Sequence, residues 1–133
     1  MNKNNYAVIM AGGIGSRFWP ISTQNCPKQF LDILNTGETL IQKTFKRLQK
    51  ICLTENIFIV TNNKYIDLCK NQLPNLQSQN ILCEPMMRNT APCIAYATFK
   101  IEQINKDANI LVASSDHLIK DEKEFIKIVN DSF

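Results

Sequence analysis

The chain has 133 residues, of which 44% are hydrophobic and 20% charged, and its formal net charge is +3. These values fit one ordinary globular domain. The net charge is small and the sequence has no long run of lysines and arginines, which argues against a strongly basic nucleic-acid-binding surface. No apolar run approaches the length of a membrane span, and the N-terminus lacks a small-residue cleavage site, so we expect neither membrane insertion nor a signal peptide.

Short apolar runs alternate with helical patterns along the chain. Four runs are almost continuously apolar, as strands buried on both faces are: residues 6–11, 56–61, 81–83 and 108–113. Four segments carry helix-start signals or an amphipathic spacing: residues 39–52, 65–73, 90–104 and 121–133. This alternation predicts an α/β fold in which helices cover both faces of a parallel sheet.

The unusual residues of the chain follow the predicted strands directly. Gly12-Gly13 follows the first strand, Glu84-Pro85 the third, and residues 114–117 (Ser-Ser-Asp-His) the fourth. Ligands of such sheets bind beyond the carboxyl ends of the strands. We therefore expect a binding site at this edge of the sheet.

Three of the four glycines, Gly12, Gly13 and Gly15, lie within four positions. The stretch matches neither the dinucleotide fingerprint nor the P-loop. Glycine lets the backbone approach an anion closely, and Arg17 and Lys28 follow on the same irregular segment. This arrangement predicts a polyphosphate loop with two cations, and its alternative is a tight surface turn with solvated charges.

Five cysteines occur at positions with no C-x-x-C spacing, and His117 is the single histidine. A zinc site would need clustered ligands, which the sequence does not supply. We therefore expect reduced, mostly buried cysteines and a cytoplasmic protein.

Three stretches together resemble the sugar-phosphate nucleotidyltransferase family. They are residues 11–20 (AGGIGSRFWP) with Ser22 and 27–31 (PKQFL), residues 84–92 (EPMMRNTAP), and residues 114–117 with Asp121. The Trp-Pro and Pro-Lys-Gln-Phe details are similar to the mannose-1-phosphate guanylyltransferase branch. The three motifs stand in the right order after three predicted strands, and the likeness runs through nearly the whole chain.

The resemblance implies a Rossmann-like, three-layer α/β/α fold of the nucleotide-diphospho-sugar transferase type, with a mostly parallel sheet. It implies that residues 1–133 form only the first half, an N-terminal nucleotide-binding part of a longer enzyme, and that this part alone is inactive. It also implies the strand order 3-2-1-4, with residues 110–113 at an apolar edge. Such an edge favours self-association of the isolated part. The sequence leaves open whether the protein forms a homo-oligomer.

The resemblance further implies that GTP and mannose 1-phosphate react to GDP-mannose and pyrophosphate. The attacking phosphate oxygen is already ionised, so no general base is needed, and catalysis reduces to holding anions in line and neutralising charge. Arg17 and Lys28 would be the catalytic cations, and Asp116 would hold Mg²⁺. The nucleotide would be bound by Ala11, Gly12, Gly13, Gly15, Ser16, Glu84, Pro85, Arg88, Asn89, Thr90 and Ser115.

Each assignment has a structural alternative. Asp116 could be a turn or capping residue, Arg88 a solvated charge and Asn89 an N-cap. His117 is interpreted as a hydrogen-bonding neighbour, and Trp19 either packs the loop or touches the base. Two other function classes stay open: a sugar nucleotidyltransferase with another NTP or sugar, and a nucleotide-binding module without catalytic activity.

Overall fold

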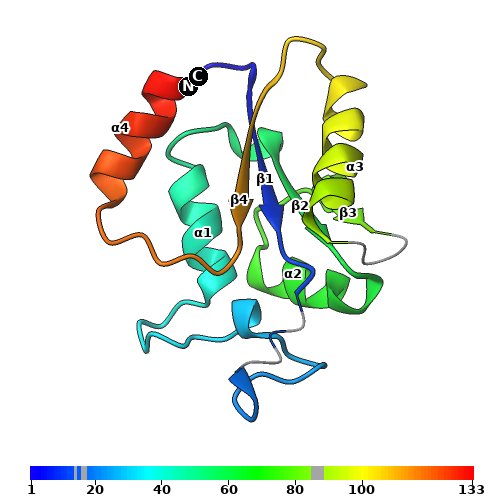
Figure 1. Ribbon diagram of the computed structural model, residues 1–133, viewed down its shortest axis with the longest axis vertical. Helices are drawn as coiled ribbons and strands as arrows, with labels where there is room; N and C mark the ends of the chain where they lie inside the picture. Colours follow the sequence, from blue (N-terminus) through cyan, green and yellow to red (C-terminus); the bar gives the residue numbers. More distant parts are fainter. Residues whose placement is uncertain (14, 16–17, 85–88) are drawn as a thin grey trace.

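A four-stranded parallel sheet forms the centre of the protein (Figure 1). The computed structural model describes residues 1–13, 15, 18–84 and 89–133. Every neighbouring pair of strands is parallel, and the order is β3 (Ile81–Cys83), β2 (Ile57–Thr61), β1 (Asn5–Met10) and β4 (Asn109–Ser114). The expected order 3-2-1-4 is confirmed, and β4 stands at an edge of the described sheet.

Two apolar cores, one on each face of the sheet, make the fold three-layered. Alternate residues of β1 point to opposite faces, so Ala7 and Ile9 join one core whereas Tyr6 and Val8 join the other. The first core lies under α1 (Leu40–Leu48), α2 (Ile66–Gln72) and α4 (Glu122–Ser132), and the second under α3 (Thr90–Glu102). Figure 1 shows α3 on one side of the sheet and α1 with α4 on the other. The predicted Rossmann-like α/β/α class is confirmed.

The predicted helices are all present, with shorter bounds. The capping box at Thr39 and Gln42 forms, and the Thr39 N–H donates to Gln42 Oε1 at 2.9 Å. Helix α1 ends at Leu48, before the predicted Cys52, yet Ile51 and Cys52 remain buried in the turn that follows. Buried apolar spacing therefore continues past the last helical residue.

All five thiols are free, as expected from their spacing. Cys52, Cys69 and Cys93 are buried, and burial raises the pKa of the Cys69 thiol to about 12. Such thiols act as small apolar side chains. Within the described ranges, no helix has both the length and the apolar character to cross a bilayer.

Candidate functional site

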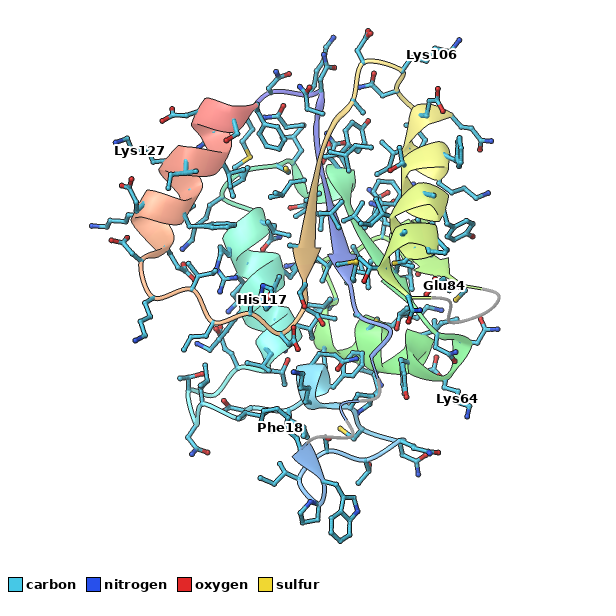
Figure 2. The ribbon with its side chains drawn as sticks, viewed as in Figure 1. Phe18, Lys64, Glu84, Lys106, His117 and Lys127 are labelled. Carbon is cyan, nitrogen blue, oxygen red and sulfur yellow. The ribbon has the colours of Figure 1, made fainter. Side chains whose placement is uncertain are left out.

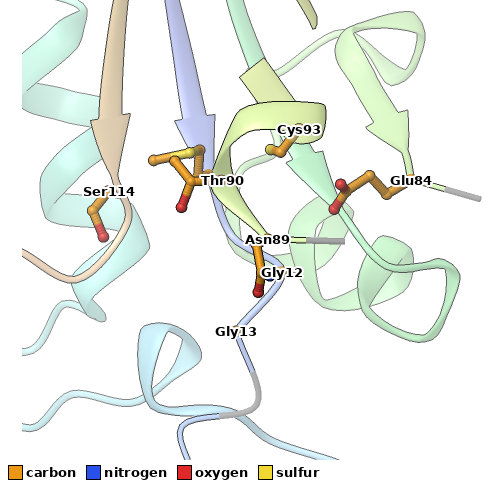
Figure 3. Close-up of a pocket in the computed structure, with 8 residues that line it drawn as sticks. Gly12, Gly13, Glu84, Asn89, Thr90, Cys93 and Ser114 are labelled. Carbon is orange, nitrogen blue, oxygen red and sulfur yellow. The ribbon is translucent and has the colours of Figure 1, made fainter. Parts of the chain in front are cut away.

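A cavity of about 410 Å³ opens at the carboxyl ends of the strands (Figure 3). This volume lies in the range of small-ligand sites. Figure 3 shows Ser114 on one side, Glu84 on the other, and Gly12 with Asn89 between them. Its lining residues are Met10, Gly12, Gly13, Glu84, Asn89, Thr90, Cys93 and Ser114. The cavity thus lies where the strand-end motifs predict a ligand.

The glycine-rich stretch leaves β1 and runs past this cavity. Ala11 is buried, and its N–H donates to Val60 O at 2.8 Å, which continues the pairing of β1 with β2 by one residue. Gly15 has a φ of +68°, and a Cβ there would lie 3.1 Å from Ser22 Oγ and 3.2 Å from Lys28 N. Position 15 therefore requires glycine, both for its backbone conformation and for its close approach to Lys28.

Side-chain donors hold the carbonyl groups of this stretch. Gln29 Nε2 donates to Ala11 O and to Gly13 O, both at 3.0 Å. Thr61 Oγ1 donates to Ala11 O at 2.9 Å, and Ser22 Oγ donates to the Gly15 carbonyl. Sequence reasoning assigned no role to Gln29 or Thr61, although Gln29 stands inside the Pro-Lys-Gln motif that carried the resemblance.

Lys28 and Asp116 form an ion pair. Lys28 begins η2, a short 3₁₀-helix (Lys28–Phe30), and Asp116 follows β4. The Lys28 ammonium also lies 5.0 Å from the Phe18 ring centroid, and the Ser114 hydroxyl donates to the Asp116 carboxylate. The structure thus joins the predicted catalytic cation to the predicted metal ligand.

The Asp116 carboxyl is ionised at neutral pH. Burial by itself raises its pKa, but the hydrogen bonds from Lys28 and Ser114, with the charges of Lys28 and His117, bring the pKa below the ordinary 3.8. Among the described residues, no group of three or more His, Cys, Asp or Glu side chains could hold a metal together. A single carboxylate suits Mg²⁺, which takes its other ligands from phosphates and water.

Glu84 has a buried carboxylate oxygen, Oε1, that no described residue reaches with a donor. Its N–H donates to Thr61 O at 3.0 Å, which fixes the residue at the end of β3. Its side chain lines the cavity, and within the described part of the chain no donor reaches Oε1. Buried carboxylate oxygens rarely stay unpaired, so Glu84 is an acceptor available to a ligand.

Asn89 and Thr90 open helix α3 at the cavity wall. Asn89 occupies the N-cap position that the sequence offered as an alternative, but its side chain makes no capping hydrogen bond. Its φ is +69° and its ψ is −170°, a combination outside the left-handed helical region that residues with a Cβ rarely adopt. The Asn89 side chain is drawn toward the cavity in Figure 3, so capping does not occupy its amide.

Ser114, the last residue of β4, and Ser115, which follows it, differ in their surroundings. Ser115 is buried; its N–H donates to Met10 O at 3.1 Å, and its carbonyl accepts from Thr44 Oγ1 at 3.3 Å. Ser114 lines the cavity instead. Strand periodicity could have indicated that adjacent serines face different sides, and the nucleotide contact predicted for Ser115 stays a prediction.

Other predicted residues take these places. His117 is exposed near Asp116, and Trp19 is 77% exposed. Figure 2 shows Phe18, Glu84 and His117 toward the carboxyl ends of the strands, and Lys106 toward the amino ends. Four predicted contacts lie outside the described residues: Ser16, Arg17, Pro85 and Arg88.

Comparisons with known proteins agree with this geometry. The sequence profile of the nucleotidyl transferase family matches residues 6–132. The chain is 44% identical over 128 residues to a mannose-1-phosphate guanylyltransferase of Salmonella muenchen, covering 92% of this chain and 26% of that protein. It is 42% identical over 120 residues to the alginate biosynthesis protein AlgA of Pseudomonas aeruginosa, and this match covers 89% of this chain and 24% of AlgA.

A solved structure shares the fold. It is described as a mannose-1-phosphate geranyltransferase from Thermus thermophilus, and it matches with a TM-score of 0.82 and 27% identity over 96% of this chain and 37% of that one. The chain spans about a quarter of the length of the curated relatives it matches.

Proposed function

Because this chain belongs to the nucleotidyl transferase family, we propose that its protein makes GDP-mannose and pyrophosphate from GTP and mannose 1-phosphate. One observation carries the proposal: the cavity at the strand ends is lined by a glycine-rich backbone and by Glu84, one of whose carboxylate oxygens has no donor among the described residues, and the Lys28–Asp116 ion pair lies beside it. The names of the similar proteins support the choice of sugar phosphate.

The reaction is an in-line attack of the sugar phosphate oxygen on the α-phosphate of the nucleotide. The bond from the α-phosphate to the bridging oxygen breaks, and pyrophosphate leaves. The nucleophile is already an anion, so the site must bring two anions together and neutralise the charge that develops on them. Lys28 supplies one such charge, and Arg17 is proposed to clamp the leaving phosphates as a planar fork.

Glu84 is proposed to read the base. Guanine presents two donors side by side, N1–H and the N2 amino group, whereas adenine presents an acceptor at N1. A carboxylate accepts from both guanine donors and repels the adenine acceptor. Among the described residues no donor reaches Oε1 of Glu84, which supports this role, and the Asn89 side chain, which makes no capping bond and lines the cavity, supports a second polar contact.

Asp116 is proposed to hold Mg²⁺. The ion would supply charge neutralisation at the phosphate oxygens. The donor chemistry fits, because the carboxylate is ionised and partly exposed, and Lys28 beside it can turn to a phosphate oxygen when a metal takes its place. Lys28 and Asp116 would then act on the same phosphates from different sides.

The test is a substrate panel with the full-length protein. Purified enzyme is mixed with each of four nucleoside triphosphates and with mannose, glucose or N-acetylglucosamine 1-phosphate, and pyrophosphate and the nucleotide sugar are quantified. The highest kcat/KM is expected for GTP with mannose 1-phosphate. A higher kcat/KM for another nucleotide and sugar phosphate would show that the proposed substrates are wrong and that the other pair is the substrate pair. Binding of GTP without turnover of any pair would indicate a nucleotide-binding module and refute the proposed reaction.

A further inference from the structure

Gln29 is buried and uses both hydrogens of its side-chain amide on the glycine-rich stretch. It is 2% exposed, and the two hydrogens of Nε2 go to Ala11 O and Gly13 O, both at 3.0 Å. No side-chain donor of Gln29 is left for a ligand, and Gln29 does not line the cavity. The residue therefore reaches the cavity only through the backbone that it holds.

The bonds of Gln29 fix the direction of a peptide group at the cavity. Thr61 Oγ1 also donates to Ala11 O, so this carbonyl points toward two donors in the protein interior. In a trans peptide the following N–H points the opposite way. The Gly12 N–H is thus turned away from Gln29 and Thr61, and Gly12 lines the cavity.

Gln29 also ties this backbone to Lys28. The two residues are adjacent in η2, and Gly15 packs against the Lys28 backbone so closely that a Cβ would lie 3.2 Å from Lys28 N. A shift of η2 would therefore move the ammonium group and the glycine backbone together.

We propose that Gln29 is a positioning residue for the triphosphate: it aims the backbone N–H of Gly12 at the phosphates and keeps this donor in register with Lys28. The inference rests on the proposed function, since it takes the cavity to bind a nucleoside triphosphate. Preorganised donors bind an anion more tightly than donors that must be ordered on binding.

The fold contains a matched control for the two hydrogen bonds of Gln29. Two other buried amides also bridge alternate main-chain carbonyls, but at the amino ends of the strands, far from the cavity residues. These are Asn56 Nδ2 with Lys3 O (3.0 Å) and Asn5 O (3.1 Å), and Asn80 Nδ2 with Glu55 O (2.8 Å) and Ile57 O (3.0 Å). Like Gln29, Asn80 is 2% exposed. Removing the amide of Asn80 therefore breaks two hydrogen bonds of the same kind as those of Gln29 and leaves the cavity unchanged.

The experiment compares Gln29→Met with Asn80→Leu in the full-length protein. Each replacement keeps the size of the side chain and removes its donors. Melting temperature, kcat, both KM values and the calorimetric affinity for GTP are measured. Both variants should melt earlier, but the KM and Kd for GTP should rise about tenfold in Gln29→Met alone, with the KM for mannose 1-phosphate nearly unchanged.

Thr61→Val gives a second, milder variant, since it removes one donor from Ala11 O and keeps the shape of the side chain. It should raise the Kd for GTP in the same direction, even if Gln29→Met fails to fold. Unchanged GTP affinity in either folded Gln29→Met or Thr61→Val, or an equal rise in Asn80→Leu, would overturn the inference. If the wild-type protein binds GTP but makes no GDP-mannose, the proposed reaction is refuted, and the role of Gln29 can still be tested by GTP affinity. If the wild-type protein does not bind GTP, both the proposed function and the role of Gln29 are refuted.

Discussion

The Lys28 ammonium group lies against the Asp116 carboxylate, although Lys28 precedes α1 and Asp116 follows β4. Both side chains keep contact with water, at 26% and 20% exposure. Such a pair contributes little to folding stability. The pair lies at the carboxyl ends of the strands, beside the proposed site, and each partner can be tested separately.

Asp116→Asn should reduce Mg²⁺-dependent turnover of the full-length enzyme by about a hundredfold or more, because the amide oxygen lacks the charge that holds the ion near the phosphates. The melting temperature should change little. Turnover and melting are compared with Asp107→Asn, which removes an exposed carboxylate before β4. Near-normal rates in Asp116→Asn would remove this residue from the metal site.

Lys28→Ala should raise the KM for GTP about tenfold and lower kcat, since the ammonium group is proposed to neutralise the triphosphate in both the bound and the reacting state. Steady-state kinetics over a GTP series gives both parameters. The matched control is Lys106→Ala, at the amino ends of the strands in Figure 2. If both variants behave like the wild type, Lys28 has no part in the site.

Two neighbouring glycines should respond differently to alanine. Gly15→Ala forces a φ of +68° on a residue with a Cβ and presses it against Ser22 and Lys28, so a loss of about 1–2 kcal/mol in unfolding free energy is expected. A Cβ on Gly13 meets nothing within 4 Å, so Gly13→Ala should fold normally and weaken GTP binding by filling cavity space. Denaturant unfolding and GTP titration separate the two effects. Equal GTP affinity in Gly13→Ala and wild type would mean that the phosphates do not pass this position.

Glu84→Gln should lower the preference for GTP over ATP by about tenfold. The amide presents one donor group and one acceptor in place of two acceptor oxygens, and one guanine donor would lose its partner. Competition between the two nucleotides, measured as the ratio of kcat/KM, gives the result directly. A ratio that does not change would assign base selection to other residues.

Glu122 should link stability to pH. The Lys50 ammonium at 2.9 Å lowers the pKa of Glu122, burial opposes this shift, and the Arg47 guanidinium at 3.2 Å adds to the lowering. A lowered pKa in the folded state means that the pairing stabilises the protein above the ordinary value of 4.5, and that the gain is lost as the pH falls through the folded pKa. Because Glu122 is 37% exposed, screening by water limits the loss in Glu122→Gln to about 1 kcal/mol at pH 7.

The check for Glu122 is urea unfolding of wild type and Glu122→Gln at pH 7 and at steps down to pH 3. The two stabilities should converge on acidification, when the wild-type carboxyl is also neutral. Glu124→Gln removes an exposed carboxylate from the same helix and should show no such convergence. If the difference in unfolding free energy between wild type and Glu122→Gln stays constant with pH, the effect of the substitution comes from packing and not from the charge of Glu122.

Sequence patterns predicted the strands to within a residue at most ends, because a strand buried on both faces must be apolar throughout. They also predicted Gly12, Gly13 and Glu84 at the cavity, since parallel strands place their carboxyl ends at one edge. The choice between Ser114 and Ser115 depends on strand pleat and register, and the role of Gln29 depends on hydrogen bonds to residues distant in sequence. Local periodicity contains neither kind of information.

The pairing of β1 with β4 has a consequence for synthesis on the ribosome. Tyr6 lies opposite Ile110, so β1, the first of the four described strands to be made, pairs with β4 only after β2 and β3 have been made. Strands β1, β2 and β3 can assemble as they leave the exit tunnel, because each pairs with the strand made just before or after it. Asp116 follows β4, so the contact with Lys28 closes only when that last strand docks. A nascent chain stalled before β4 would therefore present Lys28 without its carboxylate partner.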